Sequence, residues 1–113
     1  PEKLEKLLKE EKDIAGCVIV SPTYEGVISD IKTVSEICHE KNIPIVVDEA
    51  HGTHLNFIEP NSLRAFEPMK NPADLVIQSW HKSLGALTQT GVLHLTSERF
   101  FKYSDIKRCL DLV

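Results

Sequence analysis

Short runs of branched apolar residues, each followed by polar residues, constrain the fold of this chain most. They occupy residues 17–20, 43–48, 74–79 and 91–96. Each run is too short for an ordinary helix and is rich in residues that favour strands. We therefore predict four buried strands, and the helices must come from the segments between and around them.

Amphipathic helices are predicted on both sides of the first strand. Residues 2–12 place leucines on one face among Glu and Lys, and residues 30–42 repeat apolar residues at helical spacing. Ser29 or Asp30 can cap the second of these helices. A last helical segment, capped by Ser97 or Ser104, is expected to end at residue 113.

The connections between the strands predict their directions. A helix between the first two strands makes them parallel, whereas the link from the third to the fourth is too short for a helical crossover and makes that pair antiparallel. The segment 52–73 is long and contains three prolines, so we expect it to be functional or to cover another subunit. The fold class predicted is α/β, with three parallel strands, one antiparallel strand and covering helices.

Composition excludes several classes of partner. The net charge is −4 and no basic stripe occurs, which disfavours nucleic acid, and the apolar runs are far shorter than a membrane span. The three cysteines have no CxxC spacing, which is typical of reduced thiols in the cytoplasm. No signal peptide is present and both ends lie in helix-forming sequence, so we expect a cytoplasmic piece of a larger domain.

Reactive side chains follow two of the predicted strands. Asp48 ends the second strand and Lys82 comes just after the third. Ligands of open α/β sheets bind beyond the carboxyl ends of the strands, so these two residues should face one crevice. A lysine that can form a Schiff base and an acid that can pair with a heterocyclic nitrogen are what pyridoxal phosphate requires. Ala50 would let the flat ring lie close, and Ser79 and His81 could donate hydrogen bonds to its phosphate.

Four segments together resemble a known enzyme family. They are residues 47–54 (VDEAHGTH), 76–84 (VIQSWHKSL), 86–89 (ALTQ) and 21–26 (SPTYEG). They are similar to the major domain of the Orn/Lys/Arg decarboxylases, which are pyridoxal phosphate enzymes of the aspartate aminotransferase fold. The resemblance extends over about residues 17–100. Ser-x-His-Lys together with Asp-x-Ala-His is a strong joint signal, whereas either motif alone is weak.

The resemblance assigns roles to particular residues. It implies that Lys82 forms the Schiff base with the cofactor, that Asp48 pairs with the pyridinium nitrogen and that His51 lies near the reacting lysine. It also implies cofactor contacts, which come from Ala50 at the ring, Ser79 and His81 at the phosphate, and Thr23 at the ring hydroxyl. Trp80 departs from the small residue usual at its position, and a ring there could alter the shape of the pocket.

The resemblance also implies what the whole protein does. We expect residues 1–113 to be part of the major domain of a decarboxylase that acts on lysine, arginine or ornithine as a homo-oligomer. The upstream phosphate loop and the small C-terminal domain of the family are not in this sequence. The isolated stretch is therefore expected to bind the cofactor poorly and to be inactive.

Three other interpretations were weighed. An apolar strand ending in Asp-Glu-Ala-His is also the Walker B element of DEAH-type ATPases, with Asp48 on magnesium and Glu49 orienting water, but no GxxxxGK[ST] loop occurs and Lys82 has no role. A metal site built on His51 and His54 lacks a further ligand at a defined spacing, so no metal is expected. A decarboxylase-like module without activity is the remaining alternative. Tyr24 is predicted to be a packing aromatic.

Overall fold

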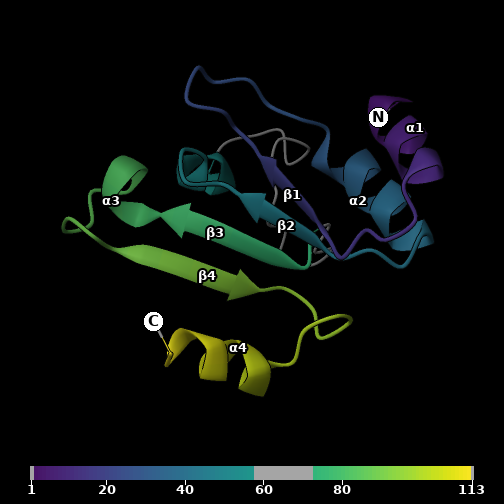
Figure 1. Cartoon of the computed structure of the whole chain (residues 1–113). Helices are drawn as coiled ribbons and strands as arrows, with labels where there is room; N and C mark the ends of the chain where they lie inside the picture. The colour runs from purple at the N-terminus through teal and green to yellow at the C-terminus, as the bar shows by residue number, and fades with distance from the viewer. Residues whose placement is uncertain (1, 58–72, 113) are drawn as a thin grey trace.

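One four-stranded sheet organises the chain (Figure 1). The computed structural model describes residues 2–57 and 73–112. The strands are β1 (Cys17–Val20), β2 (Ile45–Asp48), β3 (Leu75–Ser79) and β4 (Gly91–Leu95), and they are neighbours in that order. Strands β1, β2 and β3 are parallel, and β4 is antiparallel to β3. This confirms the predicted α/β fold and its strand directions.

The helices partly match the expected ones. They are α1 (Glu2–Glu10), α2 (Ile31–Glu40), α3 (Trp80–Ser83) and α4 (Tyr103–Leu110), with a 3-10 helix, η1, at Thr53–Phe57. The one-turn helix α3, which carries Lys82, and the helix η1 were not predicted. Residues 58–72, which form most of the predicted long loop, lie outside the described residues.

Capping was predicted correctly at one helix and wrongly at another. Asp30 caps α2, because its Oδ1 accepts a hydrogen bond from the Thr33 backbone N–H at 3.1 Å. The residue before α4 is Lys102, whose side chain makes no capping bond. The prediction that Ser97 or Ser104 caps this helix was wrong, and the Ser97 hydroxyl instead donates to Asp74 at 3.2 Å.

The hydrophobic core lies on one face of the sheet. Side chains alternate along a strand, so Ile45 and Val47 of β2 and Val76 of β3 point to the same side, and all three are fully buried. They pack with residues from α2, including Ile31 and Cys38. Burying each aliphatic side chain of this size stabilises the fold by about 1.5–3 kcal/mol. This packing makes the sheet a firm platform for the loops at its ends.

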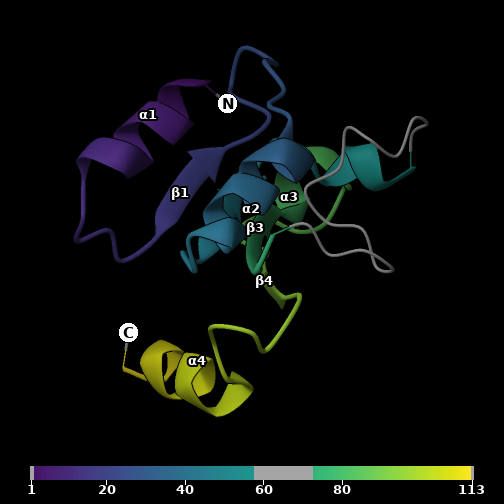
Figure 2. The same cartoon turned by 90° about the vertical axis from the view of Figure 1, so that its right-hand side faces the viewer.

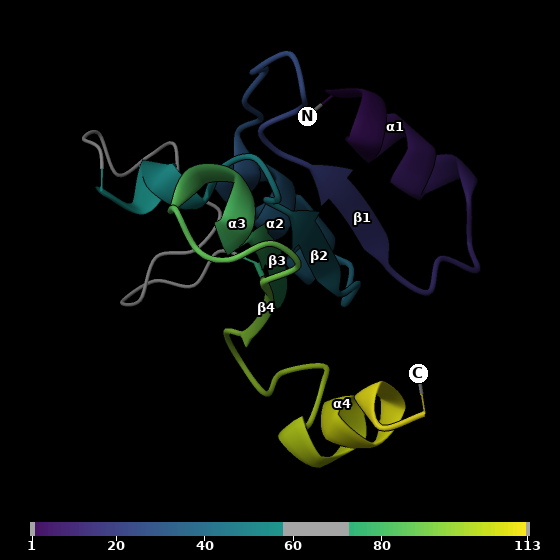
Figure 3. The same cartoon turned by 90° about the vertical axis from the view of Figure 1, so that its left-hand side faces the viewer.

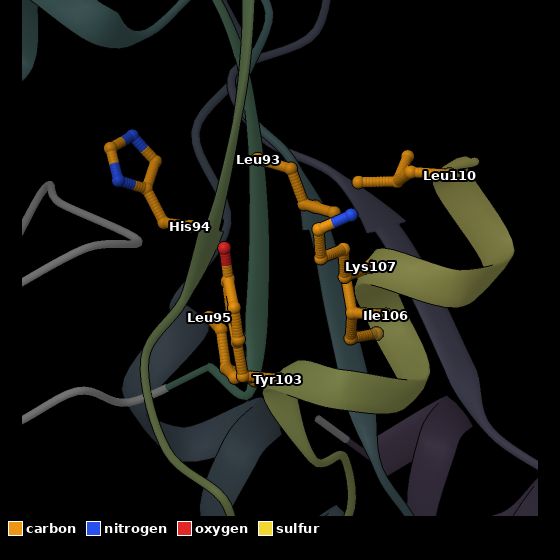
Figure 4. Close-up of a pocket in the computed structure, with 7 residues that line it drawn as sticks. All are labelled: Leu93, His94, Leu95, Tyr103, Ile106, Lys107 and Leu110. Carbon is orange, nitrogen blue, oxygen red and sulfur yellow. The ribbon is translucent and has the colours of Figure 1, made fainter.

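The opposite face of the sheet is largely open. Val18 is 73% exposed and Ile77 is 41% exposed, although both lie in strands. Figures 2 and 3 show α4 close to β4, on the other side of the sheet from α2. There α4 and β4 border an apolar pocket of about 420 Å³, lined by Leu93 and Ile106 among others. In Figure 4, the Leu93 side chain points from β4 toward α4, the helix that carries Ile106, whereas His94 points to the other side of β4.

The amino ends of the strands are joined by one buried carboxylate. Asp74, whose side chain is 1% exposed, accepts at Oδ2 from the ring of His39 and from the Ile45 backbone N–H, both at 2.9 Å. Its Oδ1 accepts from Ser97. Asp74 thereby ties α2, β2 and the segment after β4 to one point, at the end of the sheet away from Asp48 and Lys82.

Replacing Asp74 should destabilise the protein. Asp74→Ala leaves the Ile45 N–H and the His39 ring without their acceptor in a buried place, so we expect a loss of about 3 kcal/mol in the free energy of unfolding. The measurement is urea unfolding of the full-length protein. Asp111→Ala is the matched control, because Asp111 is 62% exposed and pairs only with Lys107 one helical turn away, and it should change little. Equal stability of the two variants would contradict the assignment.

No helix in the described residues has both the length and the apolar character needed to cross a membrane.

Candidate active site

The segments that follow β1, β2 and β3 gather at one end of the sheet, where Figure 1 also shows α3. The strand register aligns Val20 with Asp48, and Asp48 with Ile77. Asp48 therefore lies in the middle of this edge, and the chain beyond Ile77 leads within five residues to Lys82. The predicted placement of Asp48 and Lys82 beyond neighbouring strand ends agrees with this topology.

Lys82 and His51 are in direct contact. The Nζ atom of Lys82, on α3, lies 3.4 Å from Nε2 of His51, in the loop after β2. The two residues are 31 positions apart in the sequence, so the fold brings them together. A neutral imidazole can accept a hydrogen bond from an ammonium group, and a proton can pass between such partners.

Asp48 has one anchored oxygen and one available oxygen. Its Oδ1 accepts a hydrogen bond from the Ala50 backbone N–H at 3.0 Å, which fixes the carboxylate on its own loop. Within residues 2–57 and 73–112, no hydrogen bond is recorded to its Oδ2. The side chain is half-buried and lies on the open face of the sheet, since its strand neighbour Val47 points into the core. An external cation or N–H donor could therefore bind Oδ2.

Ser79 and His81 stand on either side of the start of α3. Ser79 occupies the N-cap position, but its hydroxyl makes no capping bond and stays available to a ligand. The Nδ1 atom of His81 lies 3.0 Å from the carbonyl oxygen of Thr90. A carbonyl only accepts, so Nδ1 must carry the proton, and Nε2 can donate to an anion only when the ring is an imidazolium. The contact with Thr90 thus leaves Nε2 of His81 as the ring atom that can face a ligand.

Thr23 is committed to its own turn. Its Oγ1 accepts from the Val27 backbone N–H at 3.2 Å, and its own N–H donates to the Val27 carbonyl oxygen at 2.9 Å. A hydrogen bond from the Glu25 backbone and a further one from the Thr23 side chain lower the pKa of Glu25, so the Thr23 hydroxyl proton already has a carboxylate partner. Its contact with a ring hydroxyl stays a prediction.

Gly52 lets the loop after β2 press against the turn after β1. A Cβ atom built on Gly52 would lie 2.4 Å from Pro22 and 2.6 Å from Glu49, which no side chain could tolerate. The close approach carries His51 to Tyr24, and their rings meet edge to face with centroids 5.5 Å apart.

Tyr24 and Ser83 are additions to the site that the sequence analysis missed. Tyr24 was predicted to be a packing aromatic; it is 83% exposed, and the ring against which it packs is that of His51. The hydroxyl of Ser83, next to Lys82, is buried and has no hydrogen-bond partner among the described residues. Its position directly after the lysine was the only available signal.

Glu49 lies on the other side of the strand end from Asp48. Its side chain is fully buried, and its Oε2 accepts from the Gln78 amide at 2.5 Å. A base that orients an attacking water has to reach the ligand crevice, so this burial argues against the ATPase interpretation of the Asp-Glu-Ala-His segment. Within the part of the chain that the structure describes, no three His, Cys, Asp or Glu side chains are arranged to hold a metal ion.

Comparisons with known proteins show which family the chain resembles in sequence. The family described as Orn/Lys/Arg decarboxylase, major domain, matches residues 1–112. An arginine decarboxylase of Halalkalibacterium halodurans is 39% identical over 94 residues, which cover 83% of this chain and 18% of that protein. An arginine decarboxylase of Bacillus subtilis is 38% identical over 94 residues, covering 83% of this chain and 19% of that protein. The chain thus spans about a fifth of the length of these relatives.

A solved structure shares the fold. The crystal structure of mouse CSAD in apo form superposes with a TM-score of 0.70 at 23% identity, over 96% of this chain and 23% of that chain. The similarity in structure therefore extends over nearly the whole chain.

Proposed function

Since this chain belongs to the Orn/Lys/Arg decarboxylase family, we propose that it holds the catalytic lysine and the pyridinium-pairing aspartate of a pyridoxal-phosphate-dependent amino acid decarboxylase. The observation that carries the proposal is the contact between Lys82 and His51 at the same end of the sheet as the available oxygen of Asp48. An amine, a proton acceptor and a carboxylate on neighbouring loops are the groups that this chemistry needs.

The residues present fit pyridoxal phosphate. Asp48 offers an unused carboxylate oxygen to a protonated ring nitrogen, Ser79 has a hydroxyl that no cap uses, and Lys82 has an amine for the aldehyde. Ala50, two residues from Asp48, would lie against the ring. When bound, the cofactor supplies a ring that accepts the electrons released as carbon dioxide leaves the substrate.

Asp48 acts on the ring nitrogen through charge. Its carboxylate would keep a proton on that nitrogen, because an anion beside a cation favours the protonated form. The bond from the Ala50 N–H to Oδ1 holds the group still, so little reorganisation is needed during the reaction.

His51 would accept the proton of Lys82 and later return it. A lysine attacks an aldehyde only as a free amine, so the proton on Nζ has to leave first. The ring nitrogen 3.4 Å away is the acceptor that the structure provides, and Tyr24 restrains the ring from its edge. His51 would also return a proton to the lysine when substrate replaces it.

The phosphate would be held by Ser79 and His81 in this chain, and Thr23 would contact the ring hydroxyl. These donors are few for a dianion in a chain of net charge −4. We therefore propose that other parts of the protein, or a second subunit of a homo-oligomer, complete the phosphate site.

The substrate is proposed to be a basic amino acid. The relatives named arginine decarboxylase make arginine the first candidate, with lysine and ornithine as the others. Nothing in the described residues selects among the three, so the groups that bind the substrate side chain are assigned to the remainder of the protein.

The test is a cofactor titration followed by an assay with three substrates. The full-length protein should develop visible absorbance with pyridoxal phosphate, and borohydride should fix the cofactor to Lys82, as peptide mass analysis can show. Carbon dioxide release should then be measured with arginine, lysine and ornithine, arginine being the expected substrate. A protein that bound no cofactor, or bound it without releasing carbon dioxide from any of the three, would contradict the proposal.

A further inference from the structure

A buried polar network centred on Gln78 lies directly behind the proposed site. The Gln78 side chain is 2% exposed, and that of Glu49 is fully buried. The Gln78 amide nitrogen donates to Glu49 Oε2 at 2.5 Å, and its oxygen lies 3.1 Å from Trp80 Nε1 and 2.9 Å from His94 Nε2. Four side chains, from the residue after β2 and from β3, α3 and β4, are thereby joined through one amide group.

The chemistry of the partners fixes the orientation of the amide. The indole N–H of Trp80 can only donate, so the atom facing it must be the Gln78 oxygen. The amide nitrogen then faces the Glu49 carboxyl, which can accept. The same oxygen requires a proton on Nε2 of His94, and because burial lowers the pKa of His94, this ring is the neutral Nε2–H form near neutral pH. A flipped amide would lose the bond from Trp80 and would place two acceptors, the Gln78 oxygen and the Glu49 carboxylate, against each other.

The network bridges the two elements that carry the reactive groups. Glu49 follows Asp48 in the chain, and its backbone N–H donates to the Ile77 carbonyl oxygen at 2.8 Å. Trp80 begins α3, whose single turn also carries Lys82. Gln78 therefore connects the loop of the carboxylate to the helix of the lysine through a single rigid side chain, on the covered side of the sheet.

We propose that Gln78 is a positioning residue, whose amide sets the separation between Asp48 and Lys82 by holding Glu49 with one end and Trp80 with the other. This inference rests on the proposed function, because the separation matters only if one ligand bridges the two residues. Gln78 touches no ligand itself; it acts through the backbone on either side. Catalytic geometry is sensitive to such support, since a displacement of about 1 Å can cost about a hundredfold in rate.

Two substitutions of Gln78 separate positioning from mere filling of space. Gln78→Met keeps the volume but removes every hydrogen bond. Gln78→Glu keeps an acceptor for Trp80 and His94 but puts a second carboxyl against Glu49. Two carboxylates at such a distance cannot both be ionised without strong repulsion, so this pair should function only with a proton between them.

The measurement is the dissociation constant of pyridoxal phosphate, by absorbance titration of the full-length protein from pH 5.5 to 8.5. Each dissociation constant is divided by that of the unmodified protein at the same pH. The effects of groups that titrate in both proteins then cancel. The titratable groups recorded in contact with Gln78 are Glu49 and His94. Asn42→Asp is the matched control, since it also turns an amide into an acid but lies on an exposed turn at the other end of the sheet.

We expect Gln78→Met to weaken cofactor binding about tenfold or more at every pH, the loss that follows from one or two buried hydrogen bonds. Gln78→Glu should be at least as weak at pH 8.5 and should recover as the pH falls. Asn42→Asp should match the unmodified protein. Trp80→Phe, which removes the N–H donor together with part of the indole ring, should weaken binding by a smaller factor and guards against a Gln78 variant that fails to fold.

Two results would overturn the inference. If the unmodified protein binds cofactor while Gln78→Met and Trp80→Phe bind it equally well, Gln78 only fills space. If Gln78→Glu shows no recovery at low pH relative to the unmodified protein, the shared-proton contact with Glu49 is wrong. An unmodified protein that binds no pyridoxal phosphate would instead overturn the proposed function, and this inference with it.

Discussion

Lys82→Ala in the full-length protein should abolish borohydride-resistant attachment of pyridoxal phosphate and lower turnover by about a thousandfold or more, because both covalent binding and proton transfer depend on this amine. Lys82 is the lysine that the fold places at the strand-end edge, 3.4 Å from His51. The measurements are the mass of the reduced, cofactor-labelled peptide and the rate of carbon dioxide release.

Lys32→Ala is the control for this experiment. Lys32 is exposed on α2 and should be dispensable for both cofactor attachment and turnover. A Lys82→Ala protein that kept near-normal decarboxylation, or a cofactor label found on another lysine, would show that the reactive amine lies elsewhere.

Asp48→Asn should leave the cofactor attached but reduce kcat/KM by about a hundredfold or more, the effect of losing one preorganised electrostatic partner of about 3 kcal/mol. The amide keeps an oxygen for the Ala50 N–H, so the loop should hold its shape. What is lost is the negative charge that keeps the ring nitrogen protonated. The activity and the cofactor content are both to be measured, because the prediction is that the activity falls while the cofactor content stays unchanged.

Asp13→Asn is the matched control for Asp48→Asn. Asp13 is exposed in the segment after α1, and the substitution is chemically the same. It should leave kcat/KM unaltered. If Asp48→Asn lowered activity less than about tenfold, the role of a pyridinium partner would be wrong, since charge stabilisation in such sites has larger effects.

The fold could be predicted largely from strand periodicity. Alternation in β2 places Ile45 and Val47 in the core and leaves Asp48 on the open face, and the short link after β3 dictates an antiparallel β4. These follow from local geometry, which the sequence specifies. The cap of α4 could not be predicted in this way, because Ser97 is drawn to the buried carboxylate of Asp74, a partner 23 residues away.

The candidate site likewise has one part that sequence patterns could indicate and another that depends on tertiary contacts. The approach of Asp48 and Lys82 to one edge follows from strand ends, so sequence patterns could indicate it. The contact of Lys82 with His51 depends on the one-turn helix α3 and on the close packing at Gly52, which no periodicity reveals. The exposed position of Tyr24 and the amide network of Gln78 likewise arise from tertiary contacts between distant segments.

The Asp74 cluster lies at the opposite end of the sheet from the candidate site, and this has a consequence for how the protein can change in evolution. The contacts of Asp74 tie α2, β2 and the segment after β4 together at the amino ends of the strands, whereas Asp48, His51 and Lys82 lie at the carboxyl ends. Marginal stability limits how many substitutions a protein can accept. A scaffold secured at the far edge can tolerate replacement of residues around the crevice, so new substrate preferences could be acquired there by mutation without loosening the fold.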